Sequence, residues 1–149
     1  MLDILVKNAY IADGTGNPGY VADLAVQGDR IADIGRLPGA TATSVIEAAN
    51  KVLCPGFIDT HLHSEAELLG GRHTAGVQMG VTTEFICPDG MGFACLPPDL
   101  LADYWRYIFG IYADDSLAAG WPTVQAYLDA FKGRAHNNIV SMAPHGAIR

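Results

Sequence analysis

Short runs of aliphatic and β-branched residues, separated by turn-forming residues, dominate the first 54 residues of the chain. Runs of this kind predict short β-strands, and the first two are expected to pair with each other after a bend at Lys7-Asn8. Gly28-Asp29, between two later runs, favours a tight hairpin with glycine at positive φ. Asp13–Gly19 is dense in turn formers and predicts a loop. The predicted strands are Leu2–Val6, Ala9–Ala12, Asp23–Gln27, Arg30–Ile34, Ser44–Ala48 and Val52–Cys54.

After residue 54 the pattern alternates between strand-like and helix-like segments. Phe57, Ile58 and Leu62 predict a short buried strand, which a Pro-Gly turn introduces. Two later strands are predicted over Val81–Ile86 and Asn138–Ala143. Strands that alternate with helices indicate parallel pairing through crossover connections. Helical segments are predicted after a Ser64 cap, over His73–Met79 ending at Gly80, after an Asp99 cap, and from Pro122 to a stop at Gly133.

The two longer helical segments repeat apolar residues at three- and four-residue spacing, which is the pattern of a helix with one buried face. We interpret both stripes as core packing rather than as cofactor-binding surfaces. The first stripe comprises Leu100, Leu101, Tyr104, Trp105, Ile108 and Phe109, and the second comprises Val124, Tyr127, Leu128 and Phe131.

Two histidines follow the first strand of this second part. Side chains of a strand alternate between its faces, so His61 and His63 are predicted to point the same way. Neutral imidazole is a good zinc ligand. A bare His-x-His pair is more often solvated surface than a metal site, but this pair ends an apolar strand and is flanked by Asp59 and Glu65. His73, on a connecting segment, is expected to be solvated.

Polar residues also follow the two later strands. Cys87–Asp89 come after the second strand, and His145 comes after the third. Because the carboxyl ends of parallel strands meet at one edge of a sheet, where ligands bind, we expect these residues and the His61/His63 pair to share a site. The order of strands and polar residues therefore predicts one site rather than scattered polar side chains.

The composition is that of a folded globular protein, with 149 residues, 50% hydrophobic and 17% charged. A net charge of −7 argues against a nucleic-acid-binding surface, which needs clustered basic residues. No membrane partner is expected either, because no apolar run is long enough to span a bilayer, and no secretory signal is visible. Cys54, Cys87 and Cys95 show no disulfide pattern, which favours a reducing, cytoplasmic location.

Three stretches resemble a known group of enzymes. Pro55–His63 is similar to the first-strand signature of the amidohydrolase superfamily, whose members use a metal centre at the carboxyl ends of the strands of a (β/α)8 barrel. Gly80–Glu84 with Cys87–Gly90 resembles the second-strand region of the N-acyl-D-amino-acid deacylases, and Ser141–Arg149 resembles their third-strand segment. Together the resemblance covers nearly the whole chain.

The resemblance implies an α/β fold class, in which the N-terminal part of a metal-dependent (β/α)8 TIM barrel is preceded by a segment of a small β-sandwich. Residues 1–54 would be the sandwich part, and residues 55–149 the first three barrel strands with their helices. A complete barrel takes roughly 250 residues, so this chain is too short to close one. We therefore expect a second chain to complete the barrel; the alternatives are a cleaved or split enzyme and a truncated reading frame.

The resemblance also implies a metal-binding set of His61, His63 and Asp89. Many members of the family have a zinc-binding cysteine at the position of Asp89, and aspartate can bind zinc through oxygen instead. Cys87, two residues earlier, is the alternative ligand. Without a metal, Asp89 would only shape the Pro-Asp-Gly turn, and Cys87 would be a small buried side chain.

Two residues of the third-strand segment align with family positions near the substrate. His145 would orient the substrate or donate a hydrogen bond to its carbonyl, and Arg149 would bind its carboxylate with both arms of the guanidinium. The structural alternatives are a strand-end histidine and an arginine without a role. No catalytic general base is identified in this chain, because the family supplies it from a later strand.

The function implied is metal-dependent hydrolysis of the amide bond of N-acyl-D-amino acids, with small N-acyl amino acids as substrates. Zn2+ is the expected cofactor, as one or two divalent ions, and an aspartate ligand makes Mn2+ or Co2+ acceptable. The chain by itself is expected to be inactive. The alternatives are another amidohydrolase, such as a cyclic amidase or a dihydroorotase-like enzyme, and a non-catalytic barrel subunit.

Overall fold

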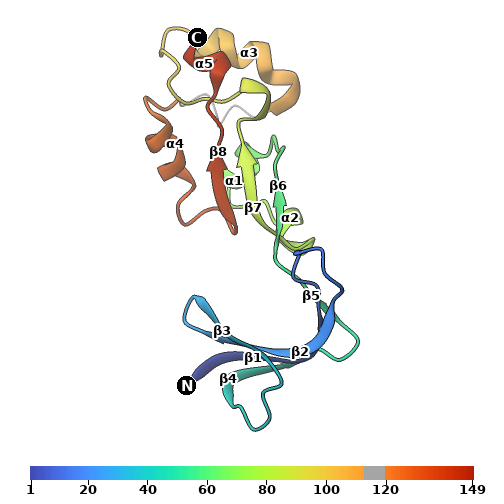
Figure 1. Cartoon of the computed structure of the whole chain (residues 1–149). Helices are drawn as coiled ribbons and strands as arrows, with labels where there is room; N and C mark the ends of the chain where they lie inside the picture. The colour runs from blue at the N-terminus through green and yellow to red at the C-terminus, as the bar shows by residue number, and fades with distance from the viewer. Residues whose placement is uncertain (113–119) are drawn as a thin grey trace. The chain divides into compact units, whose positions relative to one another are not determined.

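Two β-sheets, each built by a different part of the chain, organise this computed structural model, which describes residues 1–112 and 120–149 (Figure 1). The chain divides into two compact units, Met1–Pro55 and Gly56–Arg149. This division falls one residue after the boundary expected from the sequence. None of the described helices combines the length and the apolar character needed to cross a bilayer.

The first unit is a five-stranded sheet with strand order β3-β2-β1-β4, in which β5 also pairs with β1. β1 pairs antiparallel with β2 and parallel with both β4 and β5, and β2 pairs antiparallel with β3. Its small core consists of aliphatic residues around Ala9 and Ile11. The strands are β1 (Leu2–Ile11), β2 (Tyr20–Gln27), β3 (Arg30–Gly35), β4 (Ala42–Glu47) and β5 (Val52–Leu53).

The expected pairing of Leu2–Val6 with Ala9–Ala12 is wrong, because both runs lie in the single strand β1. Lys7 and Asn8 form a β-bulge, where the register against β2 shifts between Val6 and Ala9. Asn8 has a φ of 59°, its N–H donates to Asp23 Oδ1 at 2.9 Å, and its side-chain amide donates to Glu47. The Asp23 and Glu47 carboxylates thus accept the donor groups that the bulge leaves unpaired, and β1 continues past it as one strand. The hairpin at Gly28-Asp29 is confirmed, with Gly28 at a φ of 61°.

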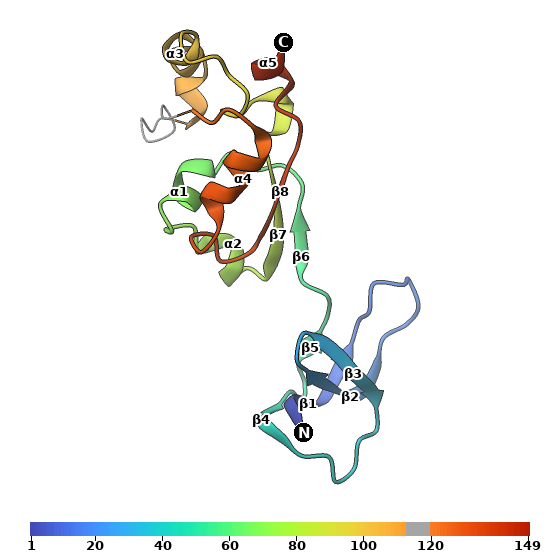
Figure 2. The same ribbon diagram turned by 90° about the vertical axis from the view of Figure 1, so that its left-hand side faces the viewer.

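The second unit carries a three-stranded sheet in the order β6-β7-β8, and both pairings are parallel, as the alternation of strands and helices predicted. In Figure 2, α1, α2 and α4 lie on one side of this sheet. The elements are β6 (Phe57–Asp59), α1 (Glu65–Leu69), α2 (Ala75–Gln78), β7 (Val81–Ile86), the 3-10 turn η1 (Pro88–Gly90), α3 (Leu101–Tyr112), α4 (Val124–Phe131), β8 (Asn138–Ser141) and α5 (His145–Ile148).

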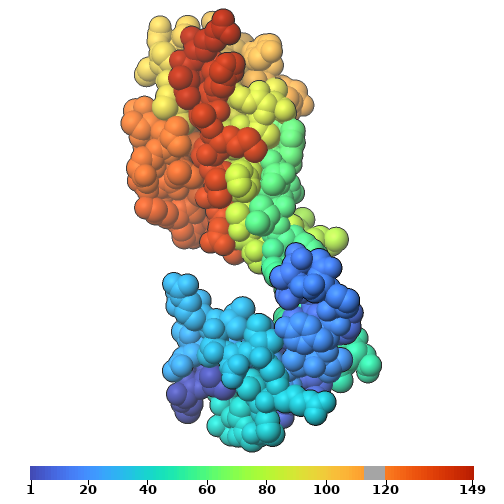
Figure 3. Space-filling view, viewed as in Figure 1, coloured from blue at the N-terminus to red at the C-terminus, as the bar shows by residue number. Residues whose placement is uncertain are grey.

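The core of this unit lies under the helices rather than on the open face of the sheet. Its largest buried side chains include Tyr127, Phe93, Tyr112 and Phe131. Figure 3 shows residues of β6, β7 and β8 side by side on the face turned to the viewer. On this sheet the apolar side chains of Phe57, Ile58 and Val140 are exposed.

β6 differs from the expected buried strand. Phe57 and Ile58 are 57% and 61% exposed, because β6 is an edge strand that pairs only with β7 among the described strands. The strand also ends at Asp59, three residues before Leu62. Asp59 Oδ1 accepts the His61 N–H at 3.0 Å, and this local turn replaces the next hydrogen bond of the ladder.

The helix starts are displaced from those expected. α3 begins at Leu101, after a turn at Asp99, and α4 begins after Thr123 rather than at Pro122. Thr123 caps α4, because its Oγ1 accepts the Ala126 N–H at 3.0 Å. Ser64 holds the N-cap position of α1 as expected, but its side chain makes no capping hydrogen bond.

The two apolar stripes are partly confirmed. Ile108 in α3 and Tyr127 and Phe131 in α4 are buried, whereas Leu100 and Phe109 are exposed. Leu100 precedes α3, so its side chain is not on the buried helical face that the spacing predicted. The short helix α5, which begins at His145, was not predicted.

Candidate metal centre

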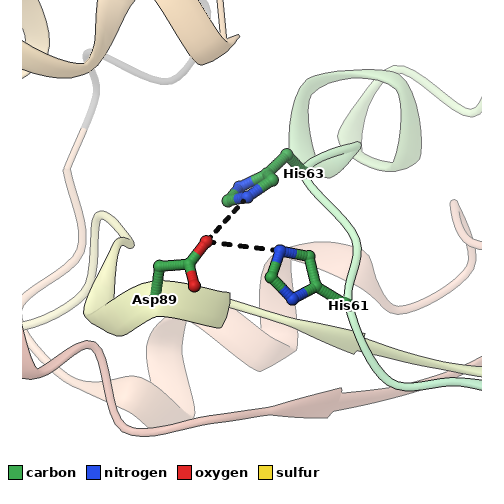
Figure 4. Close-up of side chains that lie close together, drawn as sticks. All are labelled: His61, His63 and Asp89. Carbon is green, nitrogen blue, oxygen red and sulfur yellow. Dashed lines mark ion pairs between the residues drawn. The ribbon is translucent and has the colours of Figure 1, made fainter.

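Three side chains converge at the carboxyl end of the sheet of the second unit. Oδ2 of Asp89 lies 3.2 Å from Nε2 of His61 and 3.3 Å from Nε2 of His63 (Figure 4). Among the described residues, this is the one group of three or more His, Cys, Asp or Glu side chains whose potential ligand atoms all lie within 4.8 Å of one another. His63 is mostly enclosed, whereas His61 and Asp89 are open to solvent. The cluster is therefore accessible from one side.

The two histidines reach the cluster by a route other than the one expected. They lie after β6, on an irregular segment, so strand alternation does not orient them. The Asp59 turn redirects the chain at His61, and α1 begins two residues after His63. Their rings still meet, edge to face, with centroids 5.3 Å apart.

Asp89 is presented by an unusual backbone turn after β7. Cys87 and Asp89 both have left-handed conformations, with φ of 62° and 58°, and Gly90 follows at 75°. Two non-glycine residues so close together in this region cost energy, and such strain clusters at functional sites. The turn points the Asp89 carboxylate at the two imidazoles.

Glu65 is a fully buried carboxyl group beside this cluster, which the sequence placed next to the histidine pair without indicating a role for it. Its Oε1 accepts hydrogen bonds at 3.0 Å from the Cys87 N–H and at 3.0 Å from the Tyr112 hydroxyl. Burial raises the pKa of the Glu65 carboxyl to about 7, and these hydrogen bonds oppose that rise. Tyr112 also lies 3.3 Å from His63 Nδ1, and burial with the nearby Glu65 charge raises its pKa.

Cys87, the alternative ligand, points away from the cluster. Its thiol is buried and lies 3.6 Å from Ser141 Oγ, inside the core of the unit. Burial raises the pKa of the thiol to about 12, so the thiolate that would bind a metal is disfavoured. The geometry therefore favours Asp89 over Cys87 as the third donor.

His145 and Arg149 lie at the two ends of α5 and are both exposed. Gly90 closely approaches His145, since a Cβ placed on Gly90 would come within 3.4 Å of the imidazole Nδ1. His145 is therefore next to the turn that presents Asp89. Their proposed roles toward substrate stay predictions.

His73 is not solvated as expected. Its side chain is 12% exposed, and its Nε2 lies 2.9 Å from Oε1 of Glu84, which is 1% exposed. Glu84 lies on β7 on the same side as Ile86, and α2 covers the pair. A buried carboxylate draws the neighbouring imidazole inward, because a lone buried charge is costly.

The donor set fits a divalent metal. Two imidazoles and one carboxylate, with an open position left for water, make up the usual ligands of a catalytic zinc site. Zinc–ligand bonds of about 2.0–2.1 Å in a tetrahedron place neighbouring ligand atoms about 3.3 Å apart. The two distances from Asp89 Oδ2, 3.2 and 3.3 Å, match this spacing.

Known proteins similar to this chain include deacylases of N-acyl-D-amino acids. D-aminoacylase from Alcaligenes xylosoxydans xylosoxydans is 36% identical over 156 aligned residues, which cover 99% of this chain and 30% of that enzyme. A crystal structure of D-aminoacylase, described as defining a novel subset of amidohydrolases, matches with a TM-score of 0.80 and 31% identity, over 99% of this chain and 30% of that one. No protein-family model matches the chain.

A second solved structure adds the chemistry of a relative. N-acyl-D-glutamate deacylase from Bordetella bronchiseptica, complexed with zinc and a phosphonate mimic of the tetrahedral intermediate, matches with a TM-score of 0.73 and 27% identity, over 98% of this chain and 30% of that one. A binuclear metal centre has been studied in D-aminoacylase itself. The chain thus spans about 30% of the length of these relatives.

Proposed function

We propose that this chain supplies the N-terminal part of a metal-dependent hydrolase. The chain is a homologue of the N-acyl-D-amino-acid deacylases of the amidohydrolase superfamily and matches their N-terminal part. The reaction is cleavage of the amide bond of an N-acyl-D-amino acid, giving a carboxylate and a free D-amino acid. The observation that carries the proposal is the convergence of His61, His63 and Asp89 at one point.

In this proposal His61, His63 and Asp89 hold the metal, with Zn2+ favoured and Mn2+ or Co2+ as alternatives. A bound divalent ion supplies an activated water and polarises the acyl carbonyl. The number of ions, one or two, is part of the test. His145, beside the Asp89 turn, donates a hydrogen bond to the substrate carbonyl, and Arg149 pairs with the substrate carboxylate.

Three parallel strands do not make a (β/α)8 barrel. β6 and β8 each have one neighbour in the sheet, and apolar side chains such as Phe57, Ile58 and Val140 are exposed on it. Polypeptide beyond these 149 residues, proposed as a second chain, would pair with these edges. It would supply the remaining metal ligands and the general base, so the chain by itself is inactive. The first unit corresponds to part of the β-sandwich.

The location proposed is cytoplasmic. Cys54, Cys87 and Cys95 are described as free thiols, which is compatible with a reducing compartment.

The test is a substrate screen of the chain purified with any polypeptide that accompanies it, after metal analysis. Hydrolysis of N-acyl-D-amino acids but not of their L isomers supports the proposal, and so does its loss in the His61→Asn and His63→Asn variants. His136→Asn is the matched control, because His136 is exposed and outside the cluster. Preferred hydrolysis of cyclic amides would indicate another amidohydrolase, and a preparation without bound metal would indicate a non-catalytic subunit.

A further inference from the structure

We propose that Tyr112 and Glu65 hold the His63 imidazole in the form that carries hydrogen on Nδ1, leaving Nε2 free to bind a ligand. The inference rests on the proposed metal site and extends it to two residues that do not touch the metal. The contacts form a short chain: Nδ1 of His63 lies 3.3 Å from the Tyr112 hydroxyl, which donates to Oε1 of Glu65 at 3.0 Å.

The direction of these hydrogen bonds follows from the number of available hydrogens. Glu65 Oε1 accepts both the Cys87 N–H and the Tyr112 hydroxyl. It can accept both in either protonation state, because a carboxyl hydrogen can reside on Oε2, which has no partner among the described residues. A phenol has a single hydrogen. Since Tyr112 gives that hydrogen to Glu65, its oxygen can only accept from Nδ1–H of His63.

The environment keeps this chain of contacts in place. Glu65 is fully buried and Tyr112 is 6% exposed. The Tyr112 ring packs edge to face against His63 and against Phe93, with centroid distances of 5.5 and 5.2 Å. Imidazoles that bind metals almost always donate their second N–H to a protein acceptor, which fixes the ring and the tautomer. Tyr112 is that acceptor here.

The same Glu65 oxygen also supports the third donor. By accepting the N–H of Cys87, it holds the left-handed residue that begins the turn to Asp89. Glu65 itself begins α1, two residues after His63. One carboxyl oxygen therefore ties together the segments that present His63 and Asp89.

The direct test is 15N NMR of the His63 ring in the metal-free Asp89→Asn protein, purified with any accompanying polypeptide. Without metal, the Asp89 carboxylate 3.3 Å from Nε2 would itself favour hydrogen there, whereas an Asn amide can face Nε2 in either tautomer. The signal of His63 is assigned from the spectrum of a further His63→Gln change. We expect the Nδ1–H tautomer in the Asp89→Asn protein, and a shift towards Nε2–H when Tyr112→Phe, which removes only the hydroxyl, is added. Finding Nε2–H in the Asp89→Asn protein with Tyr112 intact would overturn the inference.

Metal affinity gives the second readout. Tyr112→Phe is expected to weaken Zn2+ binding about 10- to 100-fold, the usual effect of removing such an outer partner. Tyr104→Phe is the matched control, because Tyr104 also packs on Phe93, but its hydroxyl contacts the Gly92 N–H instead of His63. Equal Zn2+ affinity and an unchanged tautomer in Tyr112→Phe would contradict the proposed role.

Two Glu65 variants distinguish a role in positioning the His63 imidazole from a general loss of structure. Glu65→Gln keeps an oxygen acceptor for both donors and should retain the tautomer, whereas Glu65→Leu should lose it as Tyr112→Phe does. Equal loss in both Glu65 variants would count against the inference. If the unmodified protein binds no Zn2+ yet the tautomer responds as expected, the proposed metal function fails and the positioning of His63 stands.

Discussion

Nε2 of His73 lies 2.9 Å from Oε1 of Glu84, and both side chains are enclosed beneath α2. The second oxygen of Glu84 has no hydrogen-bond partner among the described residues. A Cβ on Gly76 of α2 would come within 2.4 Å of Oε1, so a larger residue there would displace the Glu84 carboxylate. The pair is therefore a packing feature of the unit, separate from the metal cluster.

The first prediction concerns this pair. His73→Ala removes one partner and leaves Glu84 buried without it, which should destabilise the second unit by about 3 kcal/mol. Urea unfolding followed by tryptophan fluorescence measures this, because Trp105 and Trp121 both lie in that unit. In the double variant His73→Ala with Glu84→Leu, the loss should be smaller than for His73→Ala. A loss equal to the sum of the two single variants would mean that the contact contributes nothing.

The second prediction compares two helix caps. Thr123→Ala removes a side-chain acceptor of the Ala126 N–H and should lower the free energy of unfolding by about 1 kcal/mol. Ser64→Ala, at a cap position without a side-chain hydrogen bond, should change it by less than about 0.5 kcal/mol. The same fluorescence-detected unfolding measures both variants. Equal effects would show that the Thr123 bond is not formed.

The third prediction concerns pH and the β1 bulge. Hydrogen bonds from the backbone N–H groups of Asn8 and Leu37 lower the pKa of Asp23 below its usual 3.8. Because the carboxyl is more acidic in the folded than in the unfolded chain, its contribution is present above pH 3.8 and is lost as pH falls through the folded pKa. The amide 1H shifts of Asn8 and Leu37 should titrate together with a midpoint below 3.8. Asp23→Asn should abolish that titration and lower the thermal midpoint of the first unit at pH 7.

The fourth prediction concerns metal addition. A ligand that binds only the folded state stabilises it, by about 2.7 kcal/mol at a concentration 100 times its dissociation constant. Zn2+ should therefore raise the unfolding midpoint of the second unit, and a chelator should reverse the rise. His63→Asn should lose the response, whereas His136→Asn should keep it. An identical response in both variants would place the metal elsewhere.

The meeting of His61, His63 and Asp89 could be anticipated because parallel strands deliver their carboxyl ends to one edge of a sheet. That rule needs only the order of the elements, which local patterns reveal. It did not require the histidines to lie on the strand itself, and they do not. The route of each side chain into the cluster depends on turns such as the one at Asp59, which the pattern of apolar residues does not encode.

The contact between Glu65 and Tyr112 could not be predicted, because the two residues are 47 apart in the sequence and meet only in the folded unit. A signal did exist for Glu65: it shares a helical face with Leu68 and Leu69, at spacings of three and four residues, and both are buried. The interpretation of the sequence used Glu65 only as a flank of the histidine pair and made no use of this spacing. The exposure of Phe57 was equally hidden, since sequence shows that a side chain is apolar but not whether a neighbour covers it.

The left-handed backbone at Asp89 couples the choice of metal donor, oxygen or sulfur, to the conformation of the turn. Aspartate adopts a φ near 58° more readily than most residues, whereas cysteine has no such preference. Exchanging this oxygen donor for sulfur would thus place a second cysteine, besides Cys87, at a left-handed position of this turn, at some cost in backbone strain. Metal selectivity at this position is therefore coupled to the conformation of the loop. Replacing Asp89 alone changes the donor atom but leaves a backbone that suits aspartate.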